Sequence, residues 1–243
     1  MKTLLMAGTR EARAIADQLA ADGIDAVASL AGVTDEPGLY PIQTRRGGFG
    51  GEEAQERFVK MGKFEAVIDA THPFATQISS RTLTIARRLG LRHLRVLRPA
   101  WQAQDGDRWH NVTTQDDVDK LVPKGARVFL ATGAQSIDEW SKFAEGRTLF
   151  CRRVDRTNDP FPYDGSWIIG QPPFVFAYEM RLLKTYAVDW VVARNSGGPT
   201  RAKLDAARAL GRPVALLERP AMLECDHVQS AQEALAWLTK QNA

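Results

Sequence analysis

The first thirty-two residues constrain the fold of this chain more than any other stretch. An apolar run at residues 2–7 is followed by Gly8 and Thr9, and a helical repeat of apolar residues then covers 11–23. A second apolar run occupies residues 24–30. This order predicts a β-strand, a tight turn, an α-helix and a second strand. Because the free N–H groups and the positive dipole end of the helix point at the turn, the unit offers an anion site.

The turn matches only part of the dinucleotide-binding fingerprint G-x-G-x-x-G, because Ala7 stands where another glycine is expected. Spacing alone leaves a dinucleotide site and an ordinary α/β turn as open alternatives. Gly8 would let a phosphate approach the backbone, and the Thr9 hydroxyl could either cap the helix or bond that phosphate. The second strand ends in Ser29–Gly32 without the acid that holds the ribose of NAD, and Arg10 lies in the first loop. These two features favour NADP(H) as the cofactor.

Composition bounds the class of protein. The 243 residues allow one large domain or two small ones, and a net charge of +3 does not indicate a nucleic-acid-binding protein. Cys151 and Cys225 have neither metal-ligand spacing nor a disulfide framework. We find no signal peptide pattern and no apolar segment of the ~18 residues that a membrane helix needs. We therefore expect a cytoplasmic protein without a metal, nucleic-acid or membrane partner, with its oligomeric state open and a monomer favoured.

A second loop in the first hundred residues follows a buried strand predicted at residues 64–70. Ligands of doubly wound sheets bind beyond the carboxyl ends of the strands, so residues 71–75 should face the same crevice as Gly8. His72 is therefore a better functional candidate than the other three histidines. A structural histidine bonded to backbone is the alternative.

A third loop holds four glycines within residues 47–51, directly after Arg45 and Arg46. Such a run cannot lie inside a regular element. An isolated case favours a flexible loop. The functional alternative is a backbone that folds closely over a ligand, with the arginines beside it.

The second half of the chain repeats the alternation of strands and helices. Strands are predicted near 127–132, 148–154, 167–169, 188–193 and 214–217, with helices near 114–122, from 137, at 174–186 and at 229–239. The strand ending at Ala193 leads into Arg194–Gly198, and Pro199 is expected in the first turn of a helix that carries Lys203. Arg194 could hold a carboxylate in a bidentate fork at this helix N-terminus. The alternative is a basic, solvated helix face.

This alternation predicts an α/β fold with two Rossmann-like domains, each with a parallel sheet, and a cleft between them. We place the first domain at residues 1–100 and the second at residues 101–243, with the crossover in residues 98–112.

Seven segments carry a family resemblance: AGTREA at 7–12, SLAG at 29–32, RGGFGG at 46–51, DATHPFA at 69–75, RPAW at 98–101, RNSGG at 194–198 and KLDAAR at 203–208. Together, and in this order, they resemble the precorrin-6A reductases of corrin (vitamin B12) biosynthesis. The run at 69–75 and the Asn-Ser-Gly-Gly at 195–198 are the most specific. Ala7, Arg194 and Ala134 depart from the glycine, lysine and arginine that are common in the family.

The resemblance implies an oxidoreductase in which NADPH donates a hydride to C19 of precorrin-6A and a proton is added at C18, giving precorrin-6B. It implies that NADPH is held by loops of the first domain and that the tetrapyrrole, a polycarboxylate, faces the second. The implied cofactor residues are Gly8, Thr9, Arg10, Glu11, Ala12, Ser29, Leu30, Ala31, Gly32, Gly47, Gly48, Ala70, Thr71, His72, Pro73 and Phe74. The implied substrate residues are Arg194, Asn195, Ser196, Gly197, Gly198 and Lys203.

No side chain need act as a nucleophile, because orientation of the two bound reactants can suffice. His72 is the candidate proton donor, with water as the alternative. Whether the natural substrate holds cobalt stays open. Two other functions stay open as well: a non-catalytic sensor that binds NADPH or a tetrapyrrole, and a transferase that uses a nucleotide-linked donor.

Overall fold

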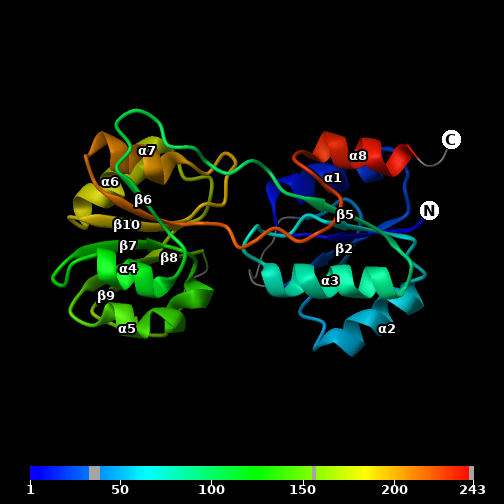
Figure 1. Ribbon diagram of the computed structural model, residues 1–243, viewed down its shortest axis with the longest axis horizontal. Helices are drawn as coiled ribbons and strands as arrows, with labels where there is room; N and C mark the ends of the chain where they lie inside the picture. The colour runs from blue at the N-terminus through cyan, green and yellow to red at the C-terminus, as the bar shows by residue number, and fades with distance from the viewer. Residues whose placement is uncertain (33–38, 155–156, 241–243) are drawn as a thin grey trace. The chain divides into compact units, whose positions relative to one another are not determined.

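The computed structural model describes residues 1–32, 39–154 and 157–240 and consists of two compact units (Figure 1). The first unit combines Met1–Pro99 with the chain from Ala221 onward, and the second is Ala100–Pro220. Each unit has a six-stranded sheet in which every strand pair is parallel. The predicted α/β fold with two parallel, Rossmann-like sheets is therefore confirmed. None of the helices in the described ranges is both long and apolar enough to cross a membrane.

The first unit orders its strands β12-β5-β4-β1-β2-β3. Its elements are β1 (Thr3–Met6), α1 (Arg10–Ala21), β2 (Ala26–Leu30), β3 (Gln43–Arg46), α2 (Glu52–Gly62), β4 (Ala66–Asp69), α3 (Thr76–Arg88), β5 (Arg92–Val96), β12 (His227–Val228) and α8 (Ala231–Thr239). Helices α1 and α8 cover one face of the sheet, and α2 and α3 cover the other (Figure 1). This is the 3-2-1-4-5-6 order of dinucleotide-binding sheets, with β12 as the sixth strand, and its switch point lies between β1 and β4.

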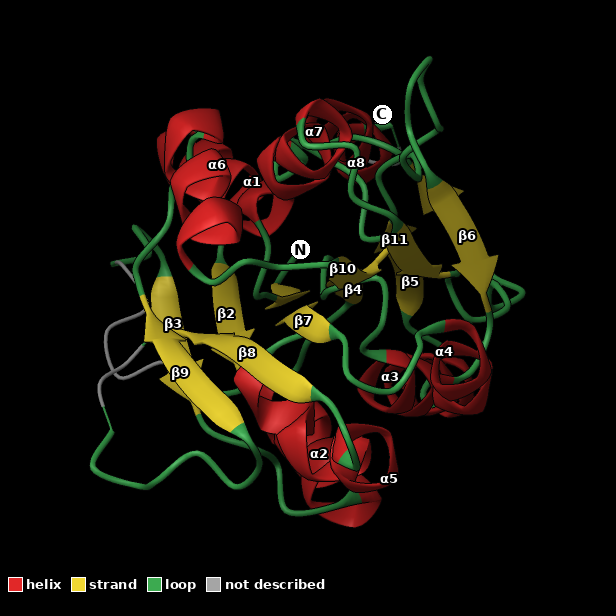
Figure 2. Ribbon diagram, turned by 90° about the vertical axis from the view of Figure 1, so that its left-hand side faces the viewer, coloured by secondary structure: helices red, strands yellow, loops and turns green. Residues whose placement is uncertain are grey.

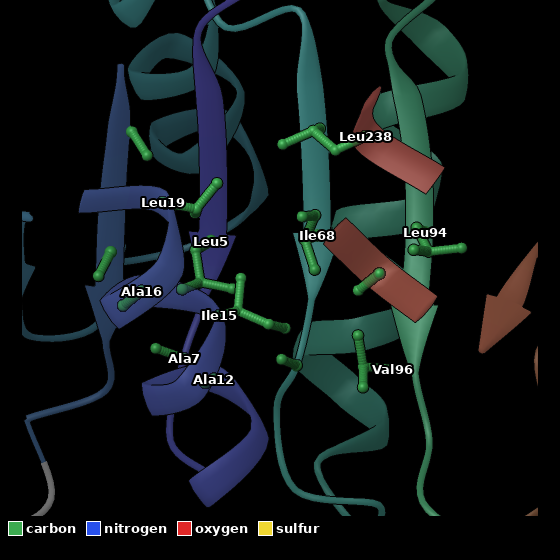
Figure 3. Packing of buried hydrophobic residues seen from close by; sticks show 14 of the residues in the cluster. Leu5, Ala7, Ala12, Ile15, Ala16, Leu19, Ile68, Leu94, Val96 and Leu238 are labelled. Atoms are coloured by element: carbon green, nitrogen blue, oxygen red, sulfur yellow. The ribbon is translucent and has the colours of Figure 1, made fainter. Parts of the chain in front are cut away.

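The core of the first unit explains why α1 lies directly over β1 (Figure 3). Ile15 and Leu19 of α1 and Leu5 of β1 are fully buried in one apolar cluster. Burying each such side chain contributes about 1.5–3 kcal/mol. Ala12 and Ala16 are also fully buried, and their short side chains let the helix approach the sheet closely. The apolar spacing of the first thirty-two residues therefore fixes the position of the β1–α1 turn.

The second unit orders its strands β6-β11-β10-β7-β8-β9. Its elements are β6 (Trp109–Val112), α4 (Gln115–Leu121), β7 (Arg127–Ala131), the 3-10 helix η1 (Ala134–Trp140), α5 (Ser141–Ala144), β8 (Thr148–Arg153), β9 (Gly165–Ile169), α6 (Phe176–Thr185), β10 (Trp190–Arg194), α7 (Ala202–Ala209) and β11 (Val214–Leu217). Figure 2 shows α6 and α5 on opposite sides of β8 and β9. Counted from β7, this is again the 3-2-1-4-5-6 order, and β6 takes the sixth place from the N-terminal side.

The C-terminal segment corrects the expected domain boundary. We expected residues up to 243 in the second domain, but the chain from Ala221 onward belongs to the first unit. His227 and Val228 pair with Arg95 and Val96 of β5, and Leu238 of α8 belongs to the same apolar core as Ile15 and Leu19 of α1. The first unit thus obtains its sixth strand from the far end of the sequence.

Two local predictions in the second unit also need correction. The expected α-helix from residue 137 is a 3-10 helix over Ala134–Trp140, followed by one turn of α-helix. The crossover at 98–112 contains a strand that we did not predict, β6, because Trp109–Val112 is too short and too polar to give a strand pattern.

Candidate functional site

The four loops predicted to bind the cofactor lie together at the carboxyl edge of the first sheet. Met6 of β1 is in register with Ser29 of β2 and with Asp69 of β4, and Leu30 pairs with Arg46 of β3. Since all these strands are parallel, residues 7–12, 29–32, 47–48 and 70–74 lie at the same end of the sheet. We call this set of loops the first edge.

The β1–α1 turn resolves the two roles left open for Thr9. Thr9 is the N-cap of α1: its Oγ1 accepts a 3.2 Å hydrogen bond from the Ala12 N–H and donates a 2.7 Å bond to the Ala70 carbonyl. A hydroxyl has one hydrogen, so the donor of Thr9 is already used. Gly8 adopts φ +136°, and a Cβ there would meet no atom within 4 Å. An anion here would therefore be held by backbone N–H groups.

Tyr40 contacts the Gly8 backbone in the β1–α1 turn, and no sequence motif predicts this contact. Burial raises the pKa of the Tyr40 phenol, while the Arg13 charge and a hydrogen bond with the Gly8 backbone act in the opposite direction. The Arg13 guanidinium lies 4.1 Å from the centre of the Tyr40 ring. Tyr40 follows no recognisable motif, so only the tertiary structure brings it to the glycine turn.

Arg45 organises the end of β2 and the glycine-rich loop. Its guanidinium donates to Ser29 Oγ at 3.1 Å, to the Gly47 carbonyl at 2.7 Å and to the Gly48 carbonyl at 2.9 Å. Burial lowers the pKa of Arg45, and the guanidinium lies 3.9 Å from the centre of the Phe49 ring. These bonds give the backbone of residues 47–48 a defined position beside Ser29.

The backbone of Gly47 lies so close to Gly32 that it crowds the position of a side chain on Gly32. A Cβ on Gly32, where φ is +78°, would lie 3.1 Å from the Gly47 nitrogen. The Gly47 N–H also donates to the Leu30 carbonyl at 3.0 Å. Arg46, the last residue of β3, is exposed beside this contact.

A buried ion pair supports the loop after β4. Arg95 Nη1 lies 2.7 Å from Asp69 Oδ2, and both side chains are at most 5% exposed. The other oxygen of Asp69 accepts from the Thr71 N–H at 3.1 Å and from the Thr71 hydroxyl at 2.7 Å. Thr71 is therefore held in place by the Asp69 carboxylate of this ion pair.

His72 lies next to this support and has the backbone contact that we considered as the alternative to a functional role. Its Nδ1 accepts a 3.3 Å hydrogen bond from the Phe74 N–H. In the neutral ring the proton then resides on Nε2, which is the atom that can donate. The contact with the Phe74 N–H restrains the orientation of the ring.

Glu11 and Arg10 differ in their surroundings. Glu11 forms an ion pair with Arg98, in which Arg98 Nη1 lies 2.7 Å from Glu11 Oε2. Arg10 is exposed at the start of α1. The side chains of Arg10, in the first edge, and of Arg46, directly before Gly47 of that edge, are thus both exposed to solvent.

The segment Arg194–Gly198 begins at the last residue of β10, at the carboxyl edge of the second sheet, and several hydrogen bonds hold its backbone. The Asn195 amide pairs with the backbone of Trp101, accepting from its N–H at 2.8 Å and donating to its carbonyl at 3.2 Å. The Trp101 indole donates to the Gly198 carbonyl at 2.7 Å. Arg219 donates to the carbonyls of Asn195 and Ser196, each at 2.9 Å. Trp101 and Arg219 are structural partners of this segment that the sequence analysis missed.

These contacts change the roles expected in the second unit. The Asn195 side chain holds Trp101, so it positions the loop. Helix α7 begins at Ala202 instead of near Pro199, so a turn separates Gly197 and Gly198 from the helix N-terminus. The prediction that Pro199 lies in the first turn of this helix is therefore wrong, while substrate binding by residues 194–198 stays a prediction.

Arg194 and Lys203, the two basic residues predicted to bind the substrate, are both partly buried. Burial lowers the pKa of Arg194, and the nearby Glu139 charge opposes that shift. Lys203 Nζ donates to the Thr200 carbonyl at 2.8 Å and lies 4.9 Å from the centre of a Trp101 ring. An arginine guanidinium stays protonated in proteins, so Arg194 carries a positive charge at this edge of the second sheet.

Comparison with known proteins identifies the family of this chain. The profile of the family described as Precorrin-6x reductase CbiJ/CobK matches residues 2–239. The chain belongs to this family. It is 37% identical to a precorrin-6A reductase of Rhodococcus erythropolis, over 98% of this chain and 97% of the relative. It is 28% identical to a cobalt-precorrin-6A reductase of Synechocystis, over 89% of this chain and 87% of the relative.

A solved structure named CobK precorrin-6A reductase has the same fold. It superimposes with a TM-score of 0.93 at 37% identity and covers 100% of this chain and 98% of that one. The family thus accounts for the two six-stranded units as a whole. The departure at Ala7 is tolerated in the fold, because Ala7 is only 7% exposed and belongs to the same apolar core as Ala12.

Proposed function

We propose that this chain reduces precorrin-6A to precorrin-6B with NADPH as the reductant. The observation that carries the proposal is the match of residues 2–239 to one reductase family, with relatives named for this substrate at 36–38% identity. The first edge supplies a nucleotide-binding geometry, and the second unit supplies cations for a polycarboxylate.

The residues of the first edge fit a dinucleotide. The open backbone at Gly8 and the N-terminus of α1 suit a pyrophosphate, and the ordered backbone at 47–48 suits the ribose end. Strand β2 ends without an acidic residue, while Arg46 is exposed at the end of the neighbouring strand. This combination supports NADPH over NADH, because a 2′-phosphate needs a cation where NAD sites place a carboxylate.

Bound NADPH would supply the hydride. The chain's own contribution would be to bind the two reactants and orient them toward each other. For the proton that completes reduction of the double bond, we propose His72 Nε2 as the donor, since Nδ1 is occupied by the Phe74 N–H. Water is the competing donor. The cleft between the two domains, in which the reactants would meet, stays a prediction.

Relatives named for the metal-free substrate are more similar to this chain than those named for the cobalt form. The former reach 36–38% identity and the latter 27–28%. This difference supports metal-free precorrin-6A as the substrate. The test is an anaerobic assay that follows NADPH absorbance and the visible spectrum of the macrocycle together, with each macrocycle in turn.

Loss of NADPH in proportion to macrocycle reduced, only when the protein is present, is the expected result with the metal-free substrate. Binding of NADPH without reduction of either macrocycle would favour the sensor hypothesis. A transferase would instead prefer a nucleotide-linked donor over NADPH.

A further inference from the structure

The second unit contains a pocket that none of the predicted site residues line. It has a volume of about 450 Å³ and lies between the loop after β9 and the first turns of α6. Its walls include Ile169, Phe174, Val175, Tyr178 and Arg181. Ile169 is the last residue of β9, so the pocket opens at the carboxyl edge of the second sheet, where ligands of such sheets bind.

The aromatic wall of this pocket, Phe174 and Tyr178, packs against the side chain of Arg152 in β8. Phe174 and Tyr178 pack with ring centres 5.5 Å apart. The Arg152 guanidinium lies 3.8 Å from the centre of the Phe174 ring and forms a bidentate pair with Glu179 of α6, at 2.9 and 2.6 Å. The Glu179 side chain is 2% exposed, so this pair joins β8 to α6 beneath the wall.

Gly170 shows how closely the wall is packed. A Cβ on this residue would lie 3.0 Å from the Tyr178 hydroxyl oxygen and 3.1 Å from Phe174 Cε1. A larger residue would therefore displace one of the two rings. The pocket is shaped before a ligand arrives, which lowers the ordering cost of binding.

The surface of the pocket combines apolar side chains with a cation at its rim. Ile169 is 42% exposed and Val175 is 59% exposed, so both present apolar surface at the pocket. Arg181 is exposed on α6, 5.9 Å from the Tyr178 ring centre. A flat, mostly apolar ring with carboxylates at its periphery matches this combination, because the ring can cover the apolar wall while a carboxylate reaches the guanidinium.

The pocket also lies at a suitable distance from Arg194 within the same unit. Strands β10, β7, β8 and β9 are consecutive neighbours in the sheet, so β9 is three strand spacings, or about 14 Å, from β10. A macrocycle with carboxylates on opposite sides can span such a distance. A nucleotide phosphate would use the cations but leave the apolar wall uncovered.

We propose that this pocket binds one side of the tetrapyrrole macrocycle, with a pyrrole-derived ring against Phe174 and Val175 and a peripheral carboxylate on Arg181. The inference rests on the proposed substrate class but adds a site to it. It makes Arg181 and Val175 substrate-binding residues, and it makes Arg152 and Glu179 positioning residues for the wall.

The test measures equilibrium binding of oxidised precorrin-6A to the full chain without NADPH, through the visible spectrum of the macrocycle. Arg181→Ala should raise the Kd roughly tenfold, the usual effect of losing one charge-assisted contact. Val175→Glu should weaken binding at least as much, because it places a negative charge beside the carboxylates. Both side chains are exposed, so both variants should fold. Lys184→Ala, an exposed residue one turn further along α6, is the matched control and should bind like the parent chain.

The outcomes separate this inference from the proposed reaction. Weaker binding by both variants, with the NADPH Kd unchanged, supports the pocket even if the parent chain never oxidises NADPH. Unchanged binding by both variants, or no binding by the parent chain, overturns the pocket, and turnover by the parent chain would still establish the reductase. An equal loss in the Lys184→Ala control would also overturn it, since the effect would then reflect general surface charge.

Discussion

The Thr9 hydroxyl donates a 2.7 Å hydrogen bond to the Ala70 carbonyl and so joins the β1–α1 turn to the loop after β4. The same oxygen caps α1 through the Ala12 N–H. These two loops flank the switch point of the first sheet, where a dinucleotide would bind. One side chain therefore fixes the relative position of the turn and of the loop that carries His72.

Replacing this hydroxyl tests that relationship. Thr9→Val should lower the free energy of unfolding by about 1 kcal/mol, the usual cost of a lost N-cap, and should weaken NADPH binding. Thr9→Ser keeps the hydroxyl and should restore both. Urea unfolding and calorimetric titration with NADPH measure the two effects. If Thr9→Val had the same free energy of unfolding and the same NADPH affinity as the parent chain, the hydrogen bond between Thr9 and Ala70 would not be needed for either.

Arg46 should decide the choice between the two nicotinamide cofactors. It is exposed at the end of β3, beside the β2 end that lacks an acid. Arg46→Ala should weaken NADPH binding roughly tenfold and leave NADH binding unchanged, because NADH lacks the 2′-phosphate. Arg10→Ala tests the arginine of the first loop in the same way.

The control for this pair is Arg57→Ala, an exposed arginine on α2, which should change neither dissociation constant. Equal dissociation constants of the parent chain for NADPH and NADH would contradict the specificity argument itself.

The buried pair between Asp69 and Arg95 should matter far more to stability than the exposed pairs do. Asp69→Asn leaves the Arg95 charge buried without its partner, which typically costs about 3–5 kcal/mol. Glu52→Gln breaks the exposed pair with Arg88 and should cost less than about 1 kcal/mol. Urea unfolding of both variants makes the comparison. A small effect of Asp69→Asn would mean that Thr71 is held by other contacts.

His93 should make stability depend on pH. Both of its ring nitrogens are buried without a hydrogen-bond partner among the described residues, and burial lowers its pKa from the ordinary 6.5. The charges of Asp69, Arg95, Arg87 and Asp226 face it. Below pH 6.5 His93 is protonated in the unfolded chain but stays neutral in the folded chain until its lowered pKa is reached. The free energy of unfolding therefore falls as the pH drops from 6.5 toward the pKa of the folded state.

His93→Phe removes this group. The free energy of unfolding, measured with urea, should then fall less as the pH is lowered from 7.5 to below 6.5. His227→Gln changes an exposed histidine and should leave the dependence as in the parent chain. The same slope in His93→Phe and in the parent chain would assign the effect to the surrounding carboxylates.

Much of the first unit could be predicted because its signals are local. The apolar spacing in residues 2–30 and the glycine at position 8 belong to one continuous stretch, and the structure has β1, α1 and β2 there. Strand β12 could not be predicted, since two residues carry no periodicity and its partner β5 lies more than a hundred residues earlier. Long-range pairing, and not local preference, assigns the C-terminal segment to the first unit.

The parts of the candidate site that the sequence missed all depend on tertiary contacts. Tyr40 reaches the Gly8 backbone, and Arg219 reaches the carbonyls of Asn195 and Ser196, from segments without any motif. In the sequence, Phe174 and Tyr178 belong only to the start of a predicted helix at 174–186, and nothing there indicates a pocket wall. A glycine turn or a Thr-His-Pro-Phe loop can be recognised by itself, whereas a contact between distant segments cannot.

The most direct test of the central claim follows the hydride itself. NADPH carrying deuterium at C4, in each of its two stereospecific forms, would be incubated anaerobically with the protein and precorrin-6A, and the product examined by mass spectrometry. The account predicts that one of the two forms transfers a single deuterium to the macrocycle and that the other does not. Reduced macrocycle without deuterium from either form would contradict direct hydride transfer from NADPH.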